Sequence, residues 1–341
     1  PYAEGGSSKQ KTGTGEYKKD VAQNRIHDKY HNILSGANRE LFAQFLIRIH
    51  QEIPNSKIAN FSTLKNLQSS NFSDFREVFR AKLEKIFVVP AKTFDNVKGE
   101  FPIGFFVWDT SKTEEFTYKE TDIFDKDENY IGRKSIYSYK DSIYFSKWIN
   151  SIKSKSGFKI GWLEGTTRNS FQHNSIIFII NNQNQMSVPR GMWVFDKNLI
   201  ECSIAFSVRK CIEATWLNDR DQFLFPNDKW KSDSDFQNDC LAFTLFSNNI
   251  QSQFGTNHWI PFTELEVNAR SKFESNFMTD FINGKVKIEN QNVDLFSQQE
   301  TLSEFETLKG LSTRLQFSEE AKLVFDAGRN LWKYYHTQEF P

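Results

Sequence analysis

The chain has 341 residues, which is enough for one large domain or two, each with its own hydrophobic core. Lys and Arg number 43, as do Asp and Glu, and this neutral balance argues against non-specific coating of nucleic acid while leaving room for a local basic cleft. No run approaches the roughly 18 apolar residues of a membrane-spanning helix, and the polar start of the chain lacks the apolar core of a secretory signal. Three cysteines, an odd number, favour a reducing cytoplasm over a disulfide framework.

The first third of the chain predicts alternating helices and strands. Residues 3–37 are too polar to bury much apolar surface. Apolar residues at helical spacing over 41–53 then predict a helix, with Asn38 as its cap and Pro54 as its end. The elements expected next are a strand over 57–63, a helix over 72–83, and strands over 85–90 and 101–109.

The last two of these strands are joined by a short turn near 96–99, so we expect them to pair antiparallel. Helices alternating with strands and closing in such a pair predict a mostly parallel sheet with a reversed last strand. In sheets of this kind the ligand lies at the carboxyl ends of the strands, at the switch point between the two halves.

From about residue 111 the pattern changes to that of an α+β region. The apolar run 176–180 predicts a buried strand, and the alternation of large apolar with small or polar residues over 200–208 predicts a half-buried one. Thr263 and Glu266 form a capping-box pattern that predicts a helix start, and a last helix is expected after Ser318.

The order of elements that follows Pro1-Tyr2 resembles the adenine-specific DNA methyltransferases with an Asn-Pro-Pro-Tyr catalytic motif. The resemblance implies that residues 1–110 are the second half of a Rossmann-like methyltransferase domain, and that 111–341 are an α+β region with target recognition as its expected role. The phrases FSVRKCIEATWLNDRDQFLFPND and FQNDCLAFTLFSNNIQSQFGTNHWIPFTE also look like the middle of large bacterial restriction–modification methylases.

In this family S-adenosylmethionine donates a methyl group to the exocyclic amine of an adenine that has been flipped out of the duplex. By resemblance, Pro1 matches the second proline of the motif and Tyr2 matches the aromatic residue that stacks on the base. Phe101 is the candidate for the opposite face of the base, with Phe94 as the fallback. The motif's Asn and first Pro have no counterpart in the sequence.

The cofactor-binding half of such a domain is also absent from the sequence. We therefore expect the chain to be inactive alone and not to bind S-adenosylmethionine appreciably. The expected partners are double-stranded DNA and either a missing N-terminal portion or a companion subunit, with no membrane.

Basic and amide side chains supply the candidate DNA contacts, because Lys and Arg neutralise phosphates and Arg and Asn read base edges. The candidates are Lys9, Lys11, Lys18, Lys19 and Arg25 in the first region, and Arg168 and Asn169, with Arg190, Arg209 and Lys210, in the second.

Two other classes of function stay open. The chain could be a non-catalytic DNA-recognition fragment, or a restriction nuclease that uses the acidic cluster Asp228, Asp233, Asp235 and Asp239. That cluster lacks the glycine and distal glutamate of a calcium loop, so a structural loop competes with a metal site. Cys202, Cys211, Cys240 and His258 lack zinc-site spacing, and no metal is predicted.

Overall fold

The computed structural model describes residues 24–95, 97, 99–140, 144–153, 156–181, 190–225, 228–247, 256–286 and 315–338. The predicted site residues Pro1, Tyr2, Lys9, Lys11, Lys18 and Lys19 lie outside this described part. The chain forms two compact units. The first contains the residues up to Tyr144 together with Ser170–Gln172 and Ala214–Leu224, and the second contains the others.

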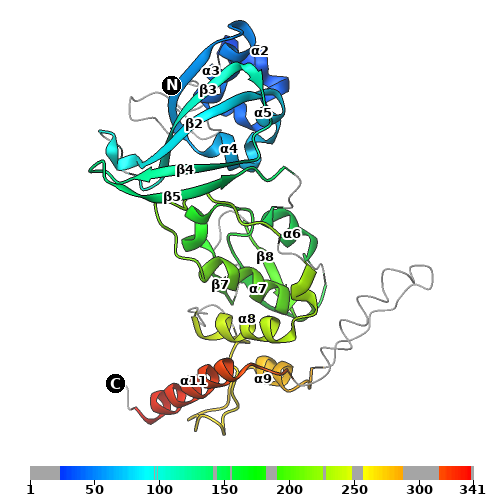
Figure 1. The fold of residues 1–341 in the computed structure, drawn as a ribbon. Helices are drawn as coiled ribbons and strands as arrows, with labels where there is room; N and C mark the ends of the chain where they lie inside the picture. Colours follow the sequence, from blue (N-terminus) through cyan, green and yellow to red (C-terminus); the bar gives the residue numbers. More distant parts are fainter. Residues whose placement is uncertain are drawn as a thin grey trace, which may run out of the picture. The chain divides into compact units, whose positions relative to one another are not determined.

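The first unit combines helices with a five-stranded mixed sheet in the order β1-β3-β2-β4-β5 (Figure 1). Its helical segments are α2 (Arg25–Leu34), η1 (Ser35–Arg39), α3 (Leu41–Glu52), α4 (Lys65–Gln68), η2 (Ser70–Phe72), α5 (Ser73–Val78) and η3 (Ala91–Thr93). Its strands are β1 (Lys57–Thr63), β2 (Ala81–Pro90), β3 (Pro102–Thr113), β4 (Tyr118–Phe124) and β5 (Tyr130–Tyr137).

The sheet is mixed, so the prediction of a mostly parallel sheet is wrong. β3 is antiparallel to both β1 and β2, β4 is antiparallel to β5, and only the β2–β4 pairing among the described strands is parallel. A short turn joins β4 to β5, so this pair lies antiparallel, whereas residues 91–101, which include η3, join β2 to β3. The predicted antiparallel pairing of 85–90 with 101–109 is confirmed, with Phe87 opposite Phe105.

β1 and β2 run in the same direction, since both are antiparallel to β3. The long connection that this direction requires contains α4, η2 and α5. The reversed strand thus lies between two strands that a helical crossover joins.

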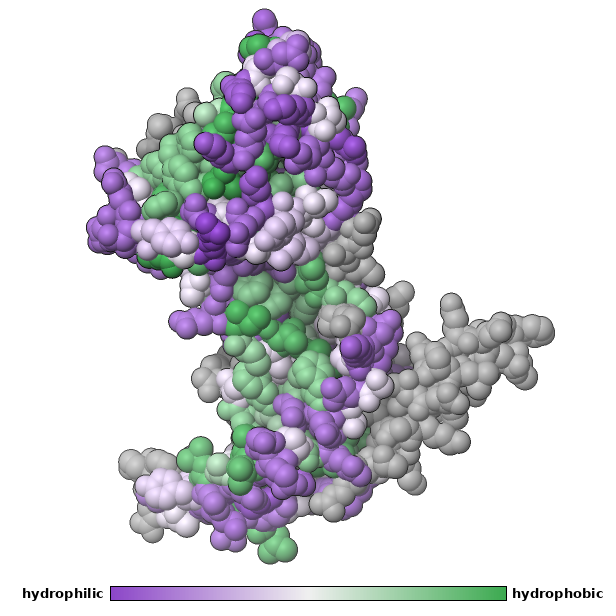
Figure 2. All heavy atoms as spheres, in the orientation of Figure 1, coloured by the Kyte–Doolittle hydropathy of each residue, from purple (hydrophilic) through white to green (hydrophobic). Residues whose placement is uncertain are grey.

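Alternation along β3 separates two apolar faces. Phe106 and Trp108 are buried in the core that also contains the apolar residues of α2, α3 and α5. Phe105 lies on the other face, where its ring centroid is 4.8 Å from that of Phe61 and 5.2 Å from that of Phe87. Figure 2 shows hydrophobic side chains gathered over the strands of this unit in the face drawn.

The helix α2 lies in a stretch predicted to be a polar loop. Asn24 caps it, because its Oδ1 accepts hydrogen bonds from the backbone N–H groups of Ile26 and His27 at 2.8 and 3.0 Å. Only Tyr30 and Leu34 of α2 are buried, so the helix carries little apolar signal. Asn38, the predicted cap of the next helix, instead lies in η1.

The second unit carries a three-stranded antiparallel sheet in the order β7-β6-β8 (Figure 1). The other strands in the described part of the chain are β6 (Lys159–Leu163), β7 (Ile179–Ile180) and β8 (Met192–Phe195). The remaining helical segments are α6 (Phe145–Ser151), η4 (Phe171–Ile176), η5 (Asp196–Asn198), α7 (Leu199–Lys210), η6 (Asp228–Lys231), α8 (Ser234–Ser247), α9 (Phe277–Ile282) and α11 (Glu319–Thr337).

The predicted strand over 200–208 is wrong, because these residues form α7. The small polar residues that gave the alternating pattern are buried too: Ser203 Oγ donates to Leu199 O at 2.9 Å, and Ser207 Oγ donates to Cys240 O at 2.9 Å. A buried serine that satisfies its hydroxyl on a carbonyl looks, in sequence, like a solvent-facing position. Of the three cysteines, Cys202 and Cys240 are buried and Cys211 is exposed.

Of the two helix starts predicted in the last part of the chain, the structure confirms one. Ser318 caps α11, with its Oγ accepting from Ala321 N at 3.1 Å. Thr263 and Glu266 do make the reciprocal bonds of a capping box, yet turns follow them and the helix α9 begins only at Phe277. Among the described residues, no helix has both the length and the apolar character needed to cross a membrane.

Asp109 in β3 should make the first unit sensitive to acid. Hydrogen bonds from Ser111, first from its hydroxyl at 2.5 Å, lower the pKa of Asp109 to about 2. A carboxylate whose pKa is depressed by folding adds stability above its ordinary pKa, and that stability is lost as pH falls from about 4 to about 2. Asp109→Asn should therefore flatten the fall of the unfolding temperature in this window, measured by circular dichroism. The exposed Asp95→Asn is the control, and equal acid slopes for the two variants would contradict the prediction.

Candidate functional site

One end of the five-stranded sheet brings together segments that are far apart in sequence. β1 ends at Thr63, which pairs with Ile103 near the start of β3, and β2 ends at Pro90. Because β1 and β2 run in the same direction, their carboxyl ends lie at this same end, where ligands bind in α/β sheets. We call this place the carboxyl-end site; its parts are the connection 64–72, Phe101 and the segment 214–224.

The connection after β1 is fixed by two side chains. Arg76 Nη1 donates to the backbone carbonyls of Asn66 and Ser69 at 3.3 and 3.0 Å. The Tyr144 hydroxyl donates to the carbonyl of Gln68 at 3.2 Å. Burial is the main cause that lowers the pKa of Arg76. These contacts hold the backbone of α4 in one position, as a binding site requires.

Phe101 is the residue for which a contact with the base is predicted, and the structure shows where it lies in the fold. It immediately precedes β3, its side chain is half-buried, and its carbonyl accepts from Ala91 N at 2.8 Å. The guanidinium carbon of Arg220 lies 5.3 Å from the centroid of its ring, within cation–π range. The fallback residue Phe94 packs on Phe61 instead, with 5.2 Å between ring centroids.

Paired charges surround Phe101 and α4. Arg220 Nε lies 3.1 Å from Asp219 Oδ2, and Arg220 Nη1 donates to Gln172 Oε1 at 2.7 Å. Asp221 accepts from Lys134 Nζ at 2.7 Å and from Gln68 Nε2 at 3.0 Å. These bonds attach the segment 214–224 to α4 and to the sheet.

Asp219 carries the clearest electrostatic perturbation at this end of the sheet. Burial raises its pKa above the ordinary value, and this desolvation exceeds the opposing attraction of Arg220 and Lys65. Asp219 lies beside the guanidinium of Arg220, which covers the ring of Phe101. This ion pair holds the guanidinium in its position over the ring.

Sequence reasoning missed the polar members of this site. Gln68 and Asp221 are 153 residues apart, and Lys134 and Asp221 are 87 apart, so no local pattern connects them. The available signal was the family-like phrase that contains Asn218-Asp219-Arg220-Asp221, whose role the sequence did not specify.

The other predicted DNA contacts are distributed over both units. Arg25 is exposed in the first turn of α2 in the first unit. Arg168 is exposed and Asn169 half-buried in the second unit, where Asn169 Oδ1 accepts from Ser146 N at 2.8 Å near the start of α6. Whether Arg25, Arg168 and Asn169 contact DNA stays a prediction.

Arg209 is the exception, because the structure contradicts its prediction as a DNA-facing residue. Its side chain is fully buried, with Nε donating to Asn174 Oδ1 at 2.9 Å and Nη1 donating to Arg168 O at 2.7 Å. Burial lowers its pKa to about 10. Its role is to hold the second unit together.

The acidic cluster has structural roles in the described part of the chain. Asp228 pairs with Lys231 at 2.9 Å, Asp233 Oδ1 accepts from Phe236 N at 2.9 Å, and Asp239 Oδ1 accepts from Ser318 N at 3.4 Å. No three His, Cys, Asp or Glu side chains among the described residues are grouped so that they could hold a metal ion. No observation here favours the nuclease.

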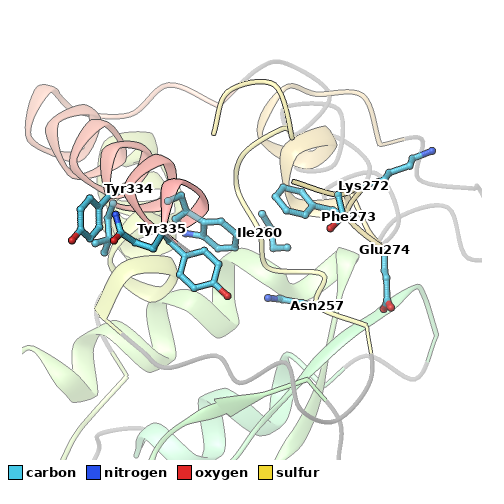
Figure 3. A pocket seen from close by; sticks show the side chains of 11 residues that line it. Asn257, Ile260, Lys272, Phe273, Glu274, Tyr334 and Tyr335 are labelled. Atoms are coloured by element: carbon cyan, nitrogen blue, oxygen red, sulfur yellow. The ribbon is translucent and has the colours of Figure 1, made fainter. Parts of the chain in front are cut away.

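The second unit has a cavity of about 880 Å3, shown in Figure 3. Tyr334 and Tyr335 of α11 line it, together with Phe273 and Ile260. The charged ends of Lys272 and Glu274 point away from it (Figure 3). Among the described residues that line it, no acid–base pair is directed inward, so they offer no groups for chemistry on a substrate.

Comparisons with known protein families, with curated protein sequences and with solved structures each gave no match.

Proposed function

We propose that this chain is part of a site-specific adenine DNA methyltransferase of a restriction–modification system. The complete enzyme would transfer a methyl group from S-adenosylmethionine to the exocyclic amine of an adenine flipped out of double-stranded DNA. The carboxyl-end site of the first unit would hold one face of that base. The second unit would contribute to recognition of the DNA.

The observation that carries the proposal is the position of Phe101. An aromatic residue enters the reversed strand at the carboxyl ends of β1 and β2, and a guanidinium covers its ring at 5.3 Å. Enzymes that act on a base take it out of the stack and hold it against aromatic or apolar side chains. The strand β3, reversed between β1 and β2, is also the feature on which the resemblance to Rossmann-like methyltransferases depends, although β4 and β5 follow it and the sheet is mixed.

The described residues do not form a site for S-adenosylmethionine. The turn from β1 to α4 contains no glycine, and the acidic side chains near it, Glu40, Asp219 and Asp221, already pair with Lys65, Arg220 and Lys134. A carboxylate that holds a ribose must be available to accept its hydroxyl groups. The cofactor site of the proposed enzyme therefore has to come from other residues, such as an N-terminal portion or a companion subunit.

The test is to produce the chain together with the polypeptide encoded directly upstream of it, in a bacterial host that lacks adenine methylation. Sequencing of the host genome for N6-methyladenine should reveal a single short motif that is modified at nearly every copy. An empty vector and the chain expressed alone are the controls. A soluble, co-purifying protein that leaves every adenine unmodified would overturn the proposal. Tight binding of one duplex motif without methylation would instead favour the non-catalytic DNA-recognition fragment.

A further inference from the structure

Two buried amides at the carboxyl-end site have unused hydrogen-bonding atoms. Asn66 is 1% exposed, and neither its Nδ2 nor its Oδ1 has a hydrogen-bond partner. Gln68 is 2% exposed, and its Oε1 is likewise without a partner. Buried polar atoms in folded proteins are nearly always paired, so each such exception requires an explanation.

The surroundings fix the backbone of Asn66 and the side chain of Gln68. Arg76 holds the backbone carbonyl of Asn66, and the Gln68 side chain is anchored through Nε2 on Asp221. Leaving these atoms unpaired destabilises the free protein. Such a cost is typical of a site whose groups are reserved for a ligand.

The charges around the amides indicate what that ligand is. Three cations of the site are each paired with a carboxylate: Lys65 with Glu40 at 2.5 Å, Arg220 with Asp219 at 3.1 Å, and Lys134 with Asp221 at 2.7 Å. The fourth cation, Arg76, donates to the backbone carbonyls of Asn66 and Ser69. A phosphate would need cations whose donors are available to it, and each of these cations already donates to a carboxylate or to backbone carbonyls. The unused groups are neutral, one donor and two acceptors.

We propose that Asn66, with Gln68, hydrogen-bonds the polar edge of the flipped adenine that stacks on Phe101. This inference rests on the function proposed above. An asparagine amide matches adenine bidentately, because its oxygen accepts from the exocyclic amine while its nitrogen donates to a ring nitrogen. Gln68 Oε1 supplies a second acceptor for the amine. These atoms are shielded from water in the free protein, so binding of the base requires a local rearrangement around them.

The experiment uses the complete enzyme and a duplex that contains its methylated motif. Asn66→Leu should lower kcat/KM for methylation by about tenfold to a hundredfold, because one bidentate base contact is lost. The same change should raise the unfolding temperature by about 2–4 °C, because it removes two unpaired buried atoms. A gain in stability together with a loss of activity is not expected of a residue with a merely structural role.

Asn181→Leu is the matched control. Asn181 is also buried with both amide atoms unpaired, but it follows β7 in the second unit. Asn181→Leu should raise the unfolding temperature and leave methylation unchanged. Wild-type methylation by Asn66→Leu, or a lower unfolding temperature for it, would overturn the inference while the proposed function stands. An enzyme that methylates no DNA even as wild type would overturn both.

Discussion

Replacing Arg209 by alanine is expected to lower the free energy of unfolding of the second unit by about 3 kcal/mol or more. Arg209 is the largest fully buried side chain among the described residues, and it donates to Asn174 Oδ1 and Arg168 O. Its guanidinium carbon also lies 5.4 Å from the ring centroid of Phe145. Alanine would leave two acceptors unpaired and open a cavity, and both effects destabilise the folded state.

Urea unfolding followed by tryptophan fluorescence measures this loss. Arg190→Ala, at an exposed arginine of the same unit, should change stability by less than about 0.5 kcal/mol. Arg209→Lys should not restore stability, because an ammonium group cannot reproduce the two directed bonds of the guanidinium. If Arg209→Ala unfolded like the wild type and only weakened DNA binding, the assignment of Arg209 to the core would be wrong.

Phe101→Ala should lower kcat/KM for methylation by about tenfold to a hundredfold in the complete enzyme. Stacking of a base on an aromatic side chain contributes about 1–3 kcal/mol, and alanine removes the ring. Phe101→Tyr should keep most of the activity, because stacking requires the ring and tolerates a hydroxyl. Tyr2→Ala and Tyr2→Phe should show the same pattern if Tyr2 stacks on the opposite face of the base.

Steady-state methylation of a motif-containing duplex with labelled S-adenosylmethionine gives these constants. Phe94→Ala is the matched control, since Phe94 packs on Phe61 and not beside Arg220. Phe94→Ala should lower the stability of the first unit and change methylation little. Equal losses for Phe94→Ala and Phe101→Ala would show that the region acts only through packing.

Local patterns predicted the elements whose burial is one-sided. The helix α3, the strands β1 to β3 and the antiparallel pairing of β2 with β3 follow from spacing and turn length. The helix α7 was mistaken for a strand because it is buried on several sides, so small serines replaced the polar face that marks a helix. The helix α2 was missed because its formation depends on the cap Asn24 more than on apolar periodicity.

The candidate site could be predicted only in its aromatic part. The strand predicted over 101–109 starts within one residue of β3, so the location of Phe101 at the strand's start could be anticipated. Gln68, Lys134 and Asp221 come together because the segment 214–224 returns to the first unit. Contacts between segments so far apart in sequence leave no signal in periodicity or composition, so only the tertiary structure reveals them.

β1 is an edge strand of its sheet, and an edge strand can pair with another polypeptide. Its backbone bonds to β3 on one side, and no described strand bonds to the other. A row of free N–H and C=O groups on such a margin can be extended by a strand from a different polypeptide, which is how β-augmentation joins proteins. The same backbone groups that would join the two parts of a divided enzyme would also promote aggregation when the first unit is produced without the other part. Low solubility that is relieved by co-production would be the sign of an open β1 edge.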